Sequence, residues 1–423
     1  MPEEISRRKK FNTDNLIQEI SEHFKGLPKL ERAQISTHDC AMAGMMIMGL
    51  KSASFLQFEE RIKETRLHQN LLKLYNVSQV PKDSTFRVRM DQIDTQELRK
   101  PFKTIFAKLQ RGNILKQYRY LENYYFVSLD GTGFYSSQAI CGDCCCVKNH
   151  RDGTQTYYHQ CLSGVLIHPD IKQVIPFMPE FICKQDGAAK NDCERNASKR
   201  FLQDLRREHP HLKIAIVEDG LASNGPHLKL LEALDMKYIT VAKEADHKFL
   251  FDWFKHAEQT HMTVIEDDDI HEFCFANGIP LNDEHHDYKV NVLSYRCGKT
   301  KYTWVTNFTI TKENAYQIMR GGRARWKIEN ETFNTLKNQG YEFEHNFGHG
   351  NAYLANNMAV FMMLAFLIDQ IQMLVNNLFQ AARKHLRTWK QLWEDIRALM
   401  RYFIFDSWDQ IYSKIAFDTM NTT

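Results

Sequence analysis

The sequence contains no apolar run long enough to cross a membrane. Its longest such run, Met358 to Ile368, has eleven residues, whereas a transmembrane helix needs about 20. The first residues, MPEEISRRKKFNTDN, are charged and lack the apolar segment of a signal peptide. We therefore expect a cytoplasmic protein with no membrane partner, in which residues 358–368 form a buried helix.

Cysteine is also scarce, and the charges are nearly balanced. Ten cysteines in 423 residues are too few for a disulfide-stapled scaffold, so we expect reduced thiols. Lys and Arg number 55 against 52 Asp and Glu, and the net charge of +3 excludes a histone-like polycation. With 43% apolar and 25% charged residues, the composition is globular, and the length suits two or three domains.

The first part of the chain has the pattern of helices. Between residues 12 and 120, apolar residues recur three and four positions apart, as at Leu67, Leu71 and Leu74. Residues 83–119 are basic with interspersed aromatics. This segment predicts either a solvated helical face or a surface for the DNA backbone, since Lys and Arg are the main phosphate contacts. We take residues 1–120 as a helical DNA-binding region.

The middle of the chain alternates between strands and helices. The pattern predicts strands at residues 124–129, 133–140, 157–167, 212–217 and 237–241, with helices at 191–209 and 226–234. A turn, Asp130-Gly-Thr-Gly, separates the first two strands. This order predicts an α/β protein with a mixed sheet flanked by helices.

The remaining regions complete this organisation. Residues 245–310 predict a mainly β insertion, and residues 312–415 are again helical in pattern. Nine acidic and no basic residues at 258–287 exclude a uniformly cationic lid over DNA. We divide the rest of the chain into a core at 121–244 and 311–370 and a helical C-terminal region, 371–423, for packing or dimerisation.

Two acidic residues follow predicted strands. Asp130 follows residues 124–129 and Asp219 follows residues 212–217, each beside a glycine. Taken singly, each Asp-Gly pair indicates a turn. Together they can share a site, because ligands bind beyond the strand ends in sheets with helical crossovers. A buried carboxylate also needs an ion pair or a metal ion.

A third acid lies on the predicted helix RWKIENETFNTLK. Glu329 shares one helical face with Trp326, Phe333 and Leu336, and Arg325 stands one turn before it. This pattern indicates either an ordinary Arg–Glu helix pair or a metal-binding carboxylate that the arginine orients. Three hard oxygen ligands favour Mg²⁺ or Mn²⁺. Two such ions can hold the attacking and the leaving oxygen of a phosphoryl transfer.

Taken in order, FVSLDGTG with Asp130, IAIVEDGLASNGP with Asp219, and RWKIENETFNTLK with Arg325 and Glu329 resemble the DDE transposases of bacterial insertion sequences. The resemblance covers residues 85–370 and is to the insertion-sequence-four type, in which a β insertion precedes the glutamate. It implies an RNase H-like core in which the three acids are catalytic and bind two Mg²⁺ or Mn²⁺ ions.

The same resemblance implies cut-and-paste transposition. Water cleaves the DNA at the ends of the element, and the freed 3′-hydroxyl then attacks target DNA. The implied partners are double-stranded DNA, as terminal inverted repeats and target, and a second copy of the chain in a homodimer. A nuclease of similar core that cuts without rejoining, and an inactive transposase-derived DNA-binding protein, are the alternatives.

The resemblance also implies DNA contacts by Arg325, Lys337, Trp304, Lys243 and Arg323. The family's third motif has a tyrosine where this chain has Gly322, and Lys337 lies one place after the motif's lysine position. Trp304 has two interpretations: it stacks on a flipped base, as in some relatives, or it packs in the core of a strand.

A cysteine-rich segment, CGDCCCVKNH, offers thiols at positions 141, 144, 145 and 146, followed by His150. Its Cys-x-x-Cys pair suits a zinc site, but no second pair follows at the usual spacing. A reduced loop is the other interpretation. His345 and His349 follow the glutamate helix and approach DNA or the metals, or else serve in capping and packing.

Overall fold

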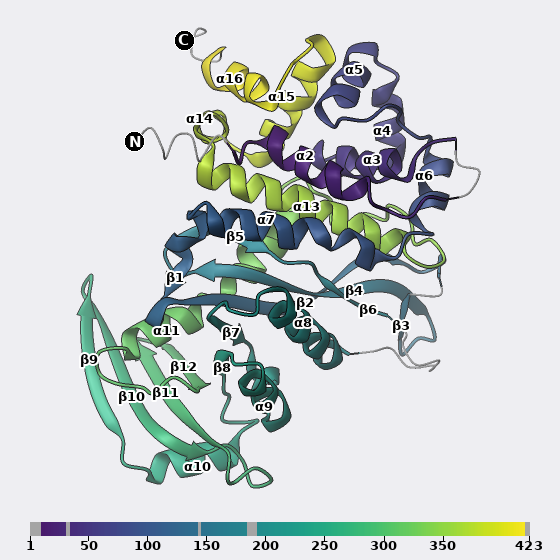
Figure 1. The fold of residues 1–423 in the computed structure, drawn as a ribbon. Coiled ribbons are helices and arrows are strands. Elements are labelled where there is room, and N and C mark those ends of the chain that lie inside the picture. The colour runs from purple at the N-terminus through teal and green to yellow at the C-terminus, as the bar shows by residue number, and fades with distance from the viewer. Residues whose placement is uncertain (1–9, 31–33, 143–144, 184–192, 419–423) are drawn as a thin grey trace.

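The computed structural model describes residues 10–30, 34–142, 145–183 and 193–418. Within them, twelve strands form one mixed sheet (Figure 1). These strands are β1 (Arg119–Tyr120), β2 (Tyr124–Ser137), β3 (Cys146–Asn149), β4 (Gln155–His168), β5 (Ile171–Pro176), β6 (Glu180–Ile182), β7 (Ile214–Glu218), β8 (Lys237–Val241), β9 (Thr260–Glu266), β10 (Asp269–Pro280), β11 (Lys289–Cys297) and β12 (Thr300–Thr306). They pair in the order β3-β4-β2-β7-β8-β12-β11-β10-β9, with β1 beside β2 and with β5 and β6 beside β4.

The helices lie on both sides of this sheet, which confirms the predicted α/β class. The N-terminal helices are α2 (Thr13–Phe24), α3 (Thr37–Gly49), α4 (Phe55–Ile62), α5 (Thr65–Leu74), α6 (Asp83–Met90) and α7 (Lys100–Arg111). The central ones are α8 (Glu194–Glu208), α9 (Gly225–Ala233), α10 (Lys248–His256), α11 (Ala315–Arg323), the π-helical segment η5 (Ile328–Phe333) and α12 (Asn334–Asn338). The C-terminal ones are α13 (Leu354–Val375), α14 (Asn377–His385), α15 (Trp389–Tyr402) and α16 (Trp408–Asp418).

Helix α13 forms the centre of the helical layer. Twenty of its 22 residues are buried, and it contacts α3 on one side and β5 on the other. Among the described residues it is the one helix long and apolar enough to cross a membrane. Its burial is that of a core helix in a soluble protein, and it confirms the buried helix predicted at residues 358–368.

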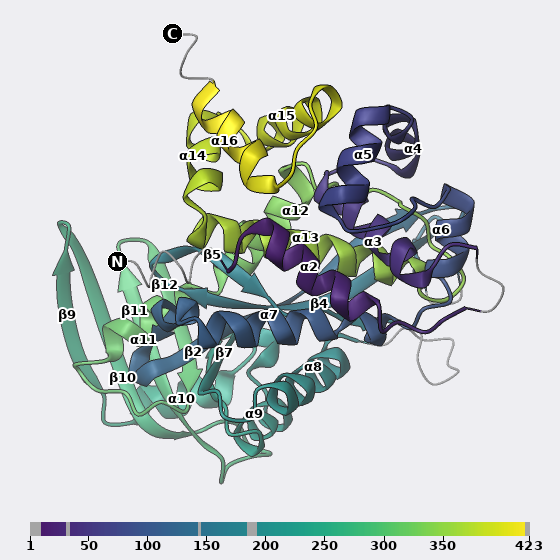
Figure 2. The same cartoon turned by 45° about the horizontal axis from the view of Figure 1, so that its top comes forward.

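The two ends of the chain pack together in this layer (Figures 1 and 2). The Asn70 side chain in α5 donates a hydrogen bond of 2.8 Å to the carbonyl of Met400 in α15. The hydroxyls of Thr13 and Tyr412 lie 3.0 Å apart, and Trp393 is 3% exposed. The predicted N-terminal and C-terminal helical regions are therefore joined in one helical layer, and Trp393, Trp408 and Tyr412 pack inside it.

Strand β2 is longer than predicted. The sequence predicts a turn at Asp130, but β2 continues through it and pairs Asp130 with Ser163 of β4. Gly131 does not form a turn. It allows the Glu194 side chain to approach the strand closely, because a Cβ atom at Gly131 would lie 2.0 Å from Oε1 of Glu194. Asp130 therefore lies within a strand and not at its end.

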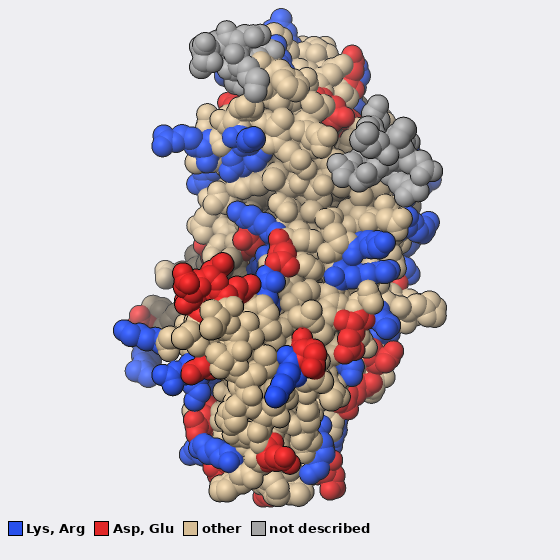
Figure 3. All heavy atoms as spheres, turned by 90° about the vertical axis from the view of Figure 1, so that its left-hand side faces the viewer, with Lys and Arg blue, Asp and Glu red and all other residues tan. Residues whose placement is uncertain are grey.

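The predicted β insertion extends the core sheet. Strand β12 pairs antiparallel with β8, with Trp304 opposite Val241, so β9 to β12 continue the sheet in a meander. Seen from the side of β9, acidic side chains gather in one cluster with basic side chains near it (Figure 3). This mixed surface agrees with the expectation that the region is not a uniformly cationic lid.

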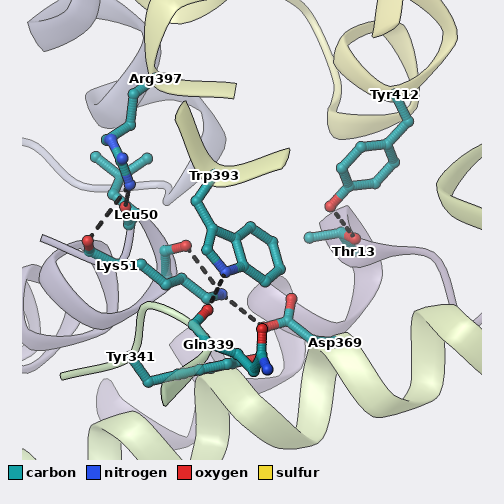
Figure 4. A network of polar contacts seen from close by, with 10 residues as sticks. Thr13, Leu50, Lys51, Gln339, Tyr341, Asp369, Trp393, Arg397 and Tyr412 are labelled. Atoms are coloured by element: carbon teal, nitrogen blue, oxygen red, sulfur yellow. Dashed lines mark hydrogen bonds and ion pairs between the residues drawn. The ribbon is translucent and has the colours of Figure 1, made fainter. Parts of the chain in front are cut away.

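A buried ion pair connects α13 to the N-terminal helices (Figure 4). Nζ of Lys51, which follows α3, lies 2.6 Å from Oδ2 of Asp369 in α13, and the two side chains are 2% and 8% exposed. The same carboxylate accepts a hydrogen bond from the Tyr341 hydroxyl. Burial lowers the pKa of Lys51 and raises that of Asp369, and the ion pair opposes both shifts. Since a lone charge at this depth is costly, the pair fixes α3 against α13.

Removal of one charge from this pair should destabilise the fold. We expect Lys51→Met to lower the free energy of unfolding by roughly 3–5 kcal/mol, because Asp369 is left buried without a counter-charge. The double variant Lys51→Met/Asp369→Asn should recover most of this loss. Urea unfolding measures both, and Lys63→Met, which breaks the exposed pair with Glu60, is the control with little expected effect. If Lys51→Met and Lys63→Met lowered the free energy of unfolding equally, the role given to the buried pair would be contradicted.

Candidate active site

The parallel pairing of β2 with β7 determines where the candidate site lies. Their register places Ser128 opposite Val217. Asp130 and Asp219 come two residues further along, so both carboxylates reach the same edge of the paired strands. Because β7 ends at Glu218 while β2 continues, Asp130 lies beside the end of its neighbour. The register therefore brings Asp130 and Asp219 to the same edge of the sheet, but Asp130 is not at a strand end as predicted.

The turn after β7 holds Asp219. Its Oδ1 accepts a hydrogen bond of 3.0 Å from the N–H of Leu221 and so caps the short 3₁₀ turn Gly220–Ala222. The predicted DNA contact Lys243 is exposed and lies beside this turn, with methylene carbons 3.9 Å from a Cβ atom built at Gly220. An exposed cation therefore stands next to the Asp219 turn.

Arg325 joins the glutamate helix to β2. Its Nη1 lies 2.9 Å from Oε1 of Glu329 and 3.7 Å from Oδ2 of Asp130. Its carbonyl oxygen accepts a hydrogen bond of 3.2 Å from the Ser128 hydroxyl. Glu329 itself lies in η5. Such π-helical turns are rare in proteins overall, but many of those that occur lie at functional sites. Two acids far apart in the sequence thus share one guanidinium group.

Negative charge accumulates around this guanidinium group. Burial raises the pKa of Asp130 to about 6; Arg325 opposes the rise, whereas Glu329 and Glu194 add to it. Burial also raises the pKa of Glu194, and Asp219 adds to that rise. Asp130 is therefore repelled by Glu329 and Glu194, and Glu194 is repelled by Asp219; a bound cation would relieve this repulsion.

Glu194 is an acid that the sequence did not single out. It is the first residue of α8, and its Oε1 accepts a hydrogen bond of 2.9 Å from Gln160 of β4. It lies over Gly131, next to Asp130. A carboxylate at the start of an amphipathic helix is favoured by the helix dipole and is too common to indicate function. Only its contact with β2 makes Glu194 part of the site.

The site offers the oxygen ligands that Mg²⁺ and Mn²⁺ prefer. The acids are not gathered into one tight cage. Among the described residues, two groups of three ligating side chains have all their ligand atoms within 4.8 Å, and neither group contains these acids. The positive charge between Asp130 and Glu329 is that of Arg325. Donor type and crowded negative charge fit a hard divalent ion.

Trp304 is a core residue of the extended sheet. It is 1% exposed, which contradicts a base-stacking contact with DNA and supports its other interpretation, packing in a strand core. The same packing involves Gly322, where the sequence departs from the motif that the resemblance implies. A Cβ atom at Gly322 would lie 2.6 Å from Nε1 of Trp304, so no larger side chain fits there.

An exposed tryptophan stands instead at Trp326. The regular helical period places Trp326 and Phe333 on one buried face, yet Trp326 is 45% exposed and Phe333 only 6%. The π-helical turn between them changes the helical phase, and this corrects the predicted face. Trp326 lines an open pocket with Arg320, Arg323 and Lys327. The predicted DNA contact Arg323 is thus exposed beside an aromatic ring.

Other predicted DNA contacts are engaged in ion pairs. Nζ of Lys337 lies 2.9 Å from Oε1 of Glu344. Within the basic segment 83–119, Nε of Arg99 lies 2.5 Å from Oε1 of Glu208 in α8. Part of this segment's charge therefore holds α7 and α8 together and is neutralised within the protein.

Part of the cysteine-rich segment belongs to a second cluster. Cys145 is buried beside His159 of β4 and His349, which lies between α12 and α13. Cys146 donates a hydrogen bond of 3.2 Å to a main-chain carbonyl, and Cys144 lies outside the described residues. The predicted Cys-x-x-Cys pair is therefore not the grouping found among the described residues, where one thiol meets two distant histidines.

The raised pKa of Asp130 predicts a loss of stability at neutral pH. The folded chain holds this proton more tightly than the unfolded chain, because the pKa rises from 3.8 to about 6. The stability contributed by Asp130 is therefore present below pH 3.8 and is lost as the pH rises through about 6. Asp130→Asn should raise the free energy of unfolding at neutral pH by roughly 2–3 kcal/mol, and little at pH 3.8.

Urea unfolding in a chelating buffer measures this change at both pH values. Asp91→Asn is a control of opposite sign: burial raises the pKa of Asp91, but N–H groups of residues 351–354 bring it below its usual range. That variant should be less stable than the unaltered chain at neutral pH. A destabilised Asp130→Asn variant at neutral pH would show that Asp130 is not under repulsion.

Comparison of the sequence with models of known protein families gives no match. Comparison with curated proteins gives no match either. The resemblance to DDE transposases therefore depends on the three acidic motifs, and function has to be inferred from the carboxylate site and its surroundings.

Proposed function

We propose that this chain is a metal-dependent DNA transposase with Asp130, Asp219 and Glu329 as its catalytic carboxylates. The observation that carries the proposal is the Arg325 guanidinium, which contacts Asp130 and Glu329, while the register of β2 with β7 brings Asp219 to the same edge of the sheet as Asp130. Carboxylates from distant parts of a chain that meet beyond the end of a parallel strand occupy the usual place of a ligand site. The reaction is phosphoryl transfer on DNA, by water and then by the 3′-hydroxyl.

The topology of the sheet supports an RNase H-like core. In the run β3-β4-β2-β7-β8, β2 is antiparallel to β4 and parallel to β7, and β7 is parallel to β8. Three antiparallel strands followed by two parallel ones are what the resemblance implies for that core. The strands β9 to β12 then correspond to the β insertion between the second aspartate and the glutamate.

The chain's own groups position and charge the acids. Asp130 accepts a hydrogen bond of 2.9 Å from the N–H of Gly131, and Arg325 pairs with Glu329 across one helical turn. The three acids would hold Mg²⁺ or Mn²⁺, which would supply Lewis acidity for the attacking water and for the leaving oxygen. Glu194 adds negative charge beside Asp130 and so favours binding of the ions.

The pocket at Trp326 supplies a place for DNA beside the acids. Arg320, Arg323 and Lys327 surround the exposed ring, and cations next to an aromatic suit phosphates and unstacked bases. Arg320 is paired with Asp170 at 2.5 Å, and Nζ of Lys327 donates a hydrogen bond of 2.8 Å to the carbonyl of Ile171. The exposed Arg323 is therefore the strongest candidate for phosphate. Terminal inverted repeats, target DNA and a homodimer that joins two ends belong to the same proposal.

Substitution of the acids tests the chemistry. With Mg²⁺ and a DNA fragment that carries the flanks of the coding region, the unaltered chain should cut at the repeats and join the 3′ ends to a second DNA. Asp130→Asn, Asp219→Asn and Glu329→Gln should each abolish cleavage and leave DNA binding intact. Glu194→Gln should slow cleavage by about 10–100-fold, as expected of a group that supports the ligands.

Glu331→Gln is the matched control, because Glu331 lies in the same π-helical segment as Glu329. It should cleave like the unaltered chain. Cut products without joined products would favour the nuclease alternative. Full cleavage by any one of the three acid variants would refute its catalytic role.

Trp326 should bind DNA through its exposed ring. Stacking of a base on an aromatic contributes about 1–3 kcal/mol, so Trp326→Ala should weaken binding to repeat-end DNA by about 5–150-fold. Trp253→Ala is the matched control, since Trp253 is equally exposed at 45% but lies on α10 and does not line the pocket at Trp326. Fluorescence anisotropy measures the affinity of each variant for DNA. Equal affinities of Trp326→Ala and Trp253→Ala would contradict a DNA contact in the Trp326 pocket.

A further inference from the structure

We propose that Cys145, His159 and His349 form a zinc site separate from the carboxylates. The three residues come from the segment before β3, from β4 and from the loop between α12 and α13. They are 0%, 1% and 3% exposed, and their ligand atoms all lie within 4.8 Å of one another. Sulfur and imidazole nitrogen are the ligands that zinc prefers, whereas Mg²⁺ prefers oxygen.

The distances between the ligand atoms match those around one ion. Sγ of Cys145 lies 3.5 Å from Nε2 of His159 and 3.2 Å from Nδ1 of His349, and the two nitrogens lie 2.9 Å apart. Tetrahedral zinc, with its usual bond lengths, separates sulfur from nitrogen by about 3.6 Å and nitrogen from nitrogen by about 3.3 Å. Shifts of a few tenths of an ångström are enough to place an ion at the centre.

Ordinary two-centre hydrogen bonds alone do not satisfy all three contacts. A neutral imidazole nitrogen either donates one hydrogen bond or accepts through a single lone pair. If His159 donates to His349, its own nitrogen has no lone pair left for the Cys145 thiol, and His349 receives two donors. If the direction is reversed, the same conflict falls on His159. A cation at the centre accepts a lone pair from each of the three atoms at once.

The rings are in the state that binds a metal. Burial, helped by His349, lowers the pKa of His159 to about 3, and burial also lowers the pKa of His349. Both imidazoles are therefore neutral at pH 7. The N–H of Gly142 donates a hydrogen bond of 3.1 Å to Sγ of Cys145, which orients this sulfur within the cluster.

The surrounding backbone is packed closely around this cluster. A Cβ atom at Gly142 would lie 2.3 Å from the carbonyl oxygen of Gly350, so the turn that carries Cys145 rests on the residue after His349. With three protein ligands, the fourth position of the ion is left for water. The ion would join the loop after the glutamate helix to β4, whose Ser163 pairs with Asp130.

Metal analysis of the full-length chain tests this site directly. Purified under reducing conditions, the unaltered chain should contain one zinc per chain. After replacement of zinc by Co²⁺, it should show the charge-transfer band of a cobalt–thiolate bond. Cys145→Ser should lose that band, and His349→Ala should lose the bound metal.

Two variants serve as controls. Cys146→Ser changes the neighbouring buried thiol, and His271→Ala changes the other three-residue grouping, Asp269, His271 and Cys297; both should keep one zinc and the band. An unaltered chain without bound zinc and without the cobalt band would overturn the proposal even if the variants fail to fold. Retention of the band in a folded Cys145→Ser variant would do the same. Neither readout depends on DNA cleavage, so it is independent of the transposase proposal.

Discussion

The register between β2 and β7 is the constraint on which the candidate site depends. Parallel strands bring their carboxyl ends to one edge, and here the pairing of Ser128 with Val217 carries Asp130 and Asp219 there together. A slip by one residue would turn one carboxylate to the opposite face of the sheet. Everything else at the site is added to this edge: Glu194 from α8, and Arg325 with Glu329 from the helix that packs against β2.

Charged side chains are arranged differently in the buried helical layer and at the edge of the sheet. Around α13, the single pair of Lys51 and Asp369 is closed on itself and serves packing. At the edge of the sheet, Asp130 and Glu329 share one guanidinium with Glu194 beside them, and burial with repulsion from Glu329 and Glu194 raises the pKa of Asp130. This arrangement weakens the fold at neutral pH but keeps negative charge where a divalent ion can use it. Excess negative charge therefore distinguishes the candidate site from the buried pair around α13.

Much of the fold and part of the site could be predicted from the sequence. Strand β8 was predicted at its observed bounds, Lys237–Val241, because a short apolar run between turn residues favours a buried strand. The turn predicted at Asp130 was wrong, because glycines in a strand resemble a turn until the side chain of Glu194 is seen above Gly131. The exposure of Trp326 and burial of Trp304 were also hidden, since a π-helical turn changes the phase of a helix without a sequence signature.

By itself, the sequence determined the class of fold and the buried helix α13. It also indicated Asp130, Asp219 and Glu329 as candidate site acids. These follow from hydrophobic period and from local residue types, which act over a few positions. Only the tertiary structure decided that Arg325 joins Asp130 to Glu329, that Glu194 stands beside them, and that Cys145 meets two distant histidines. Such contacts link residues far apart along the chain, and their geometry exists only after strands and helices have packed.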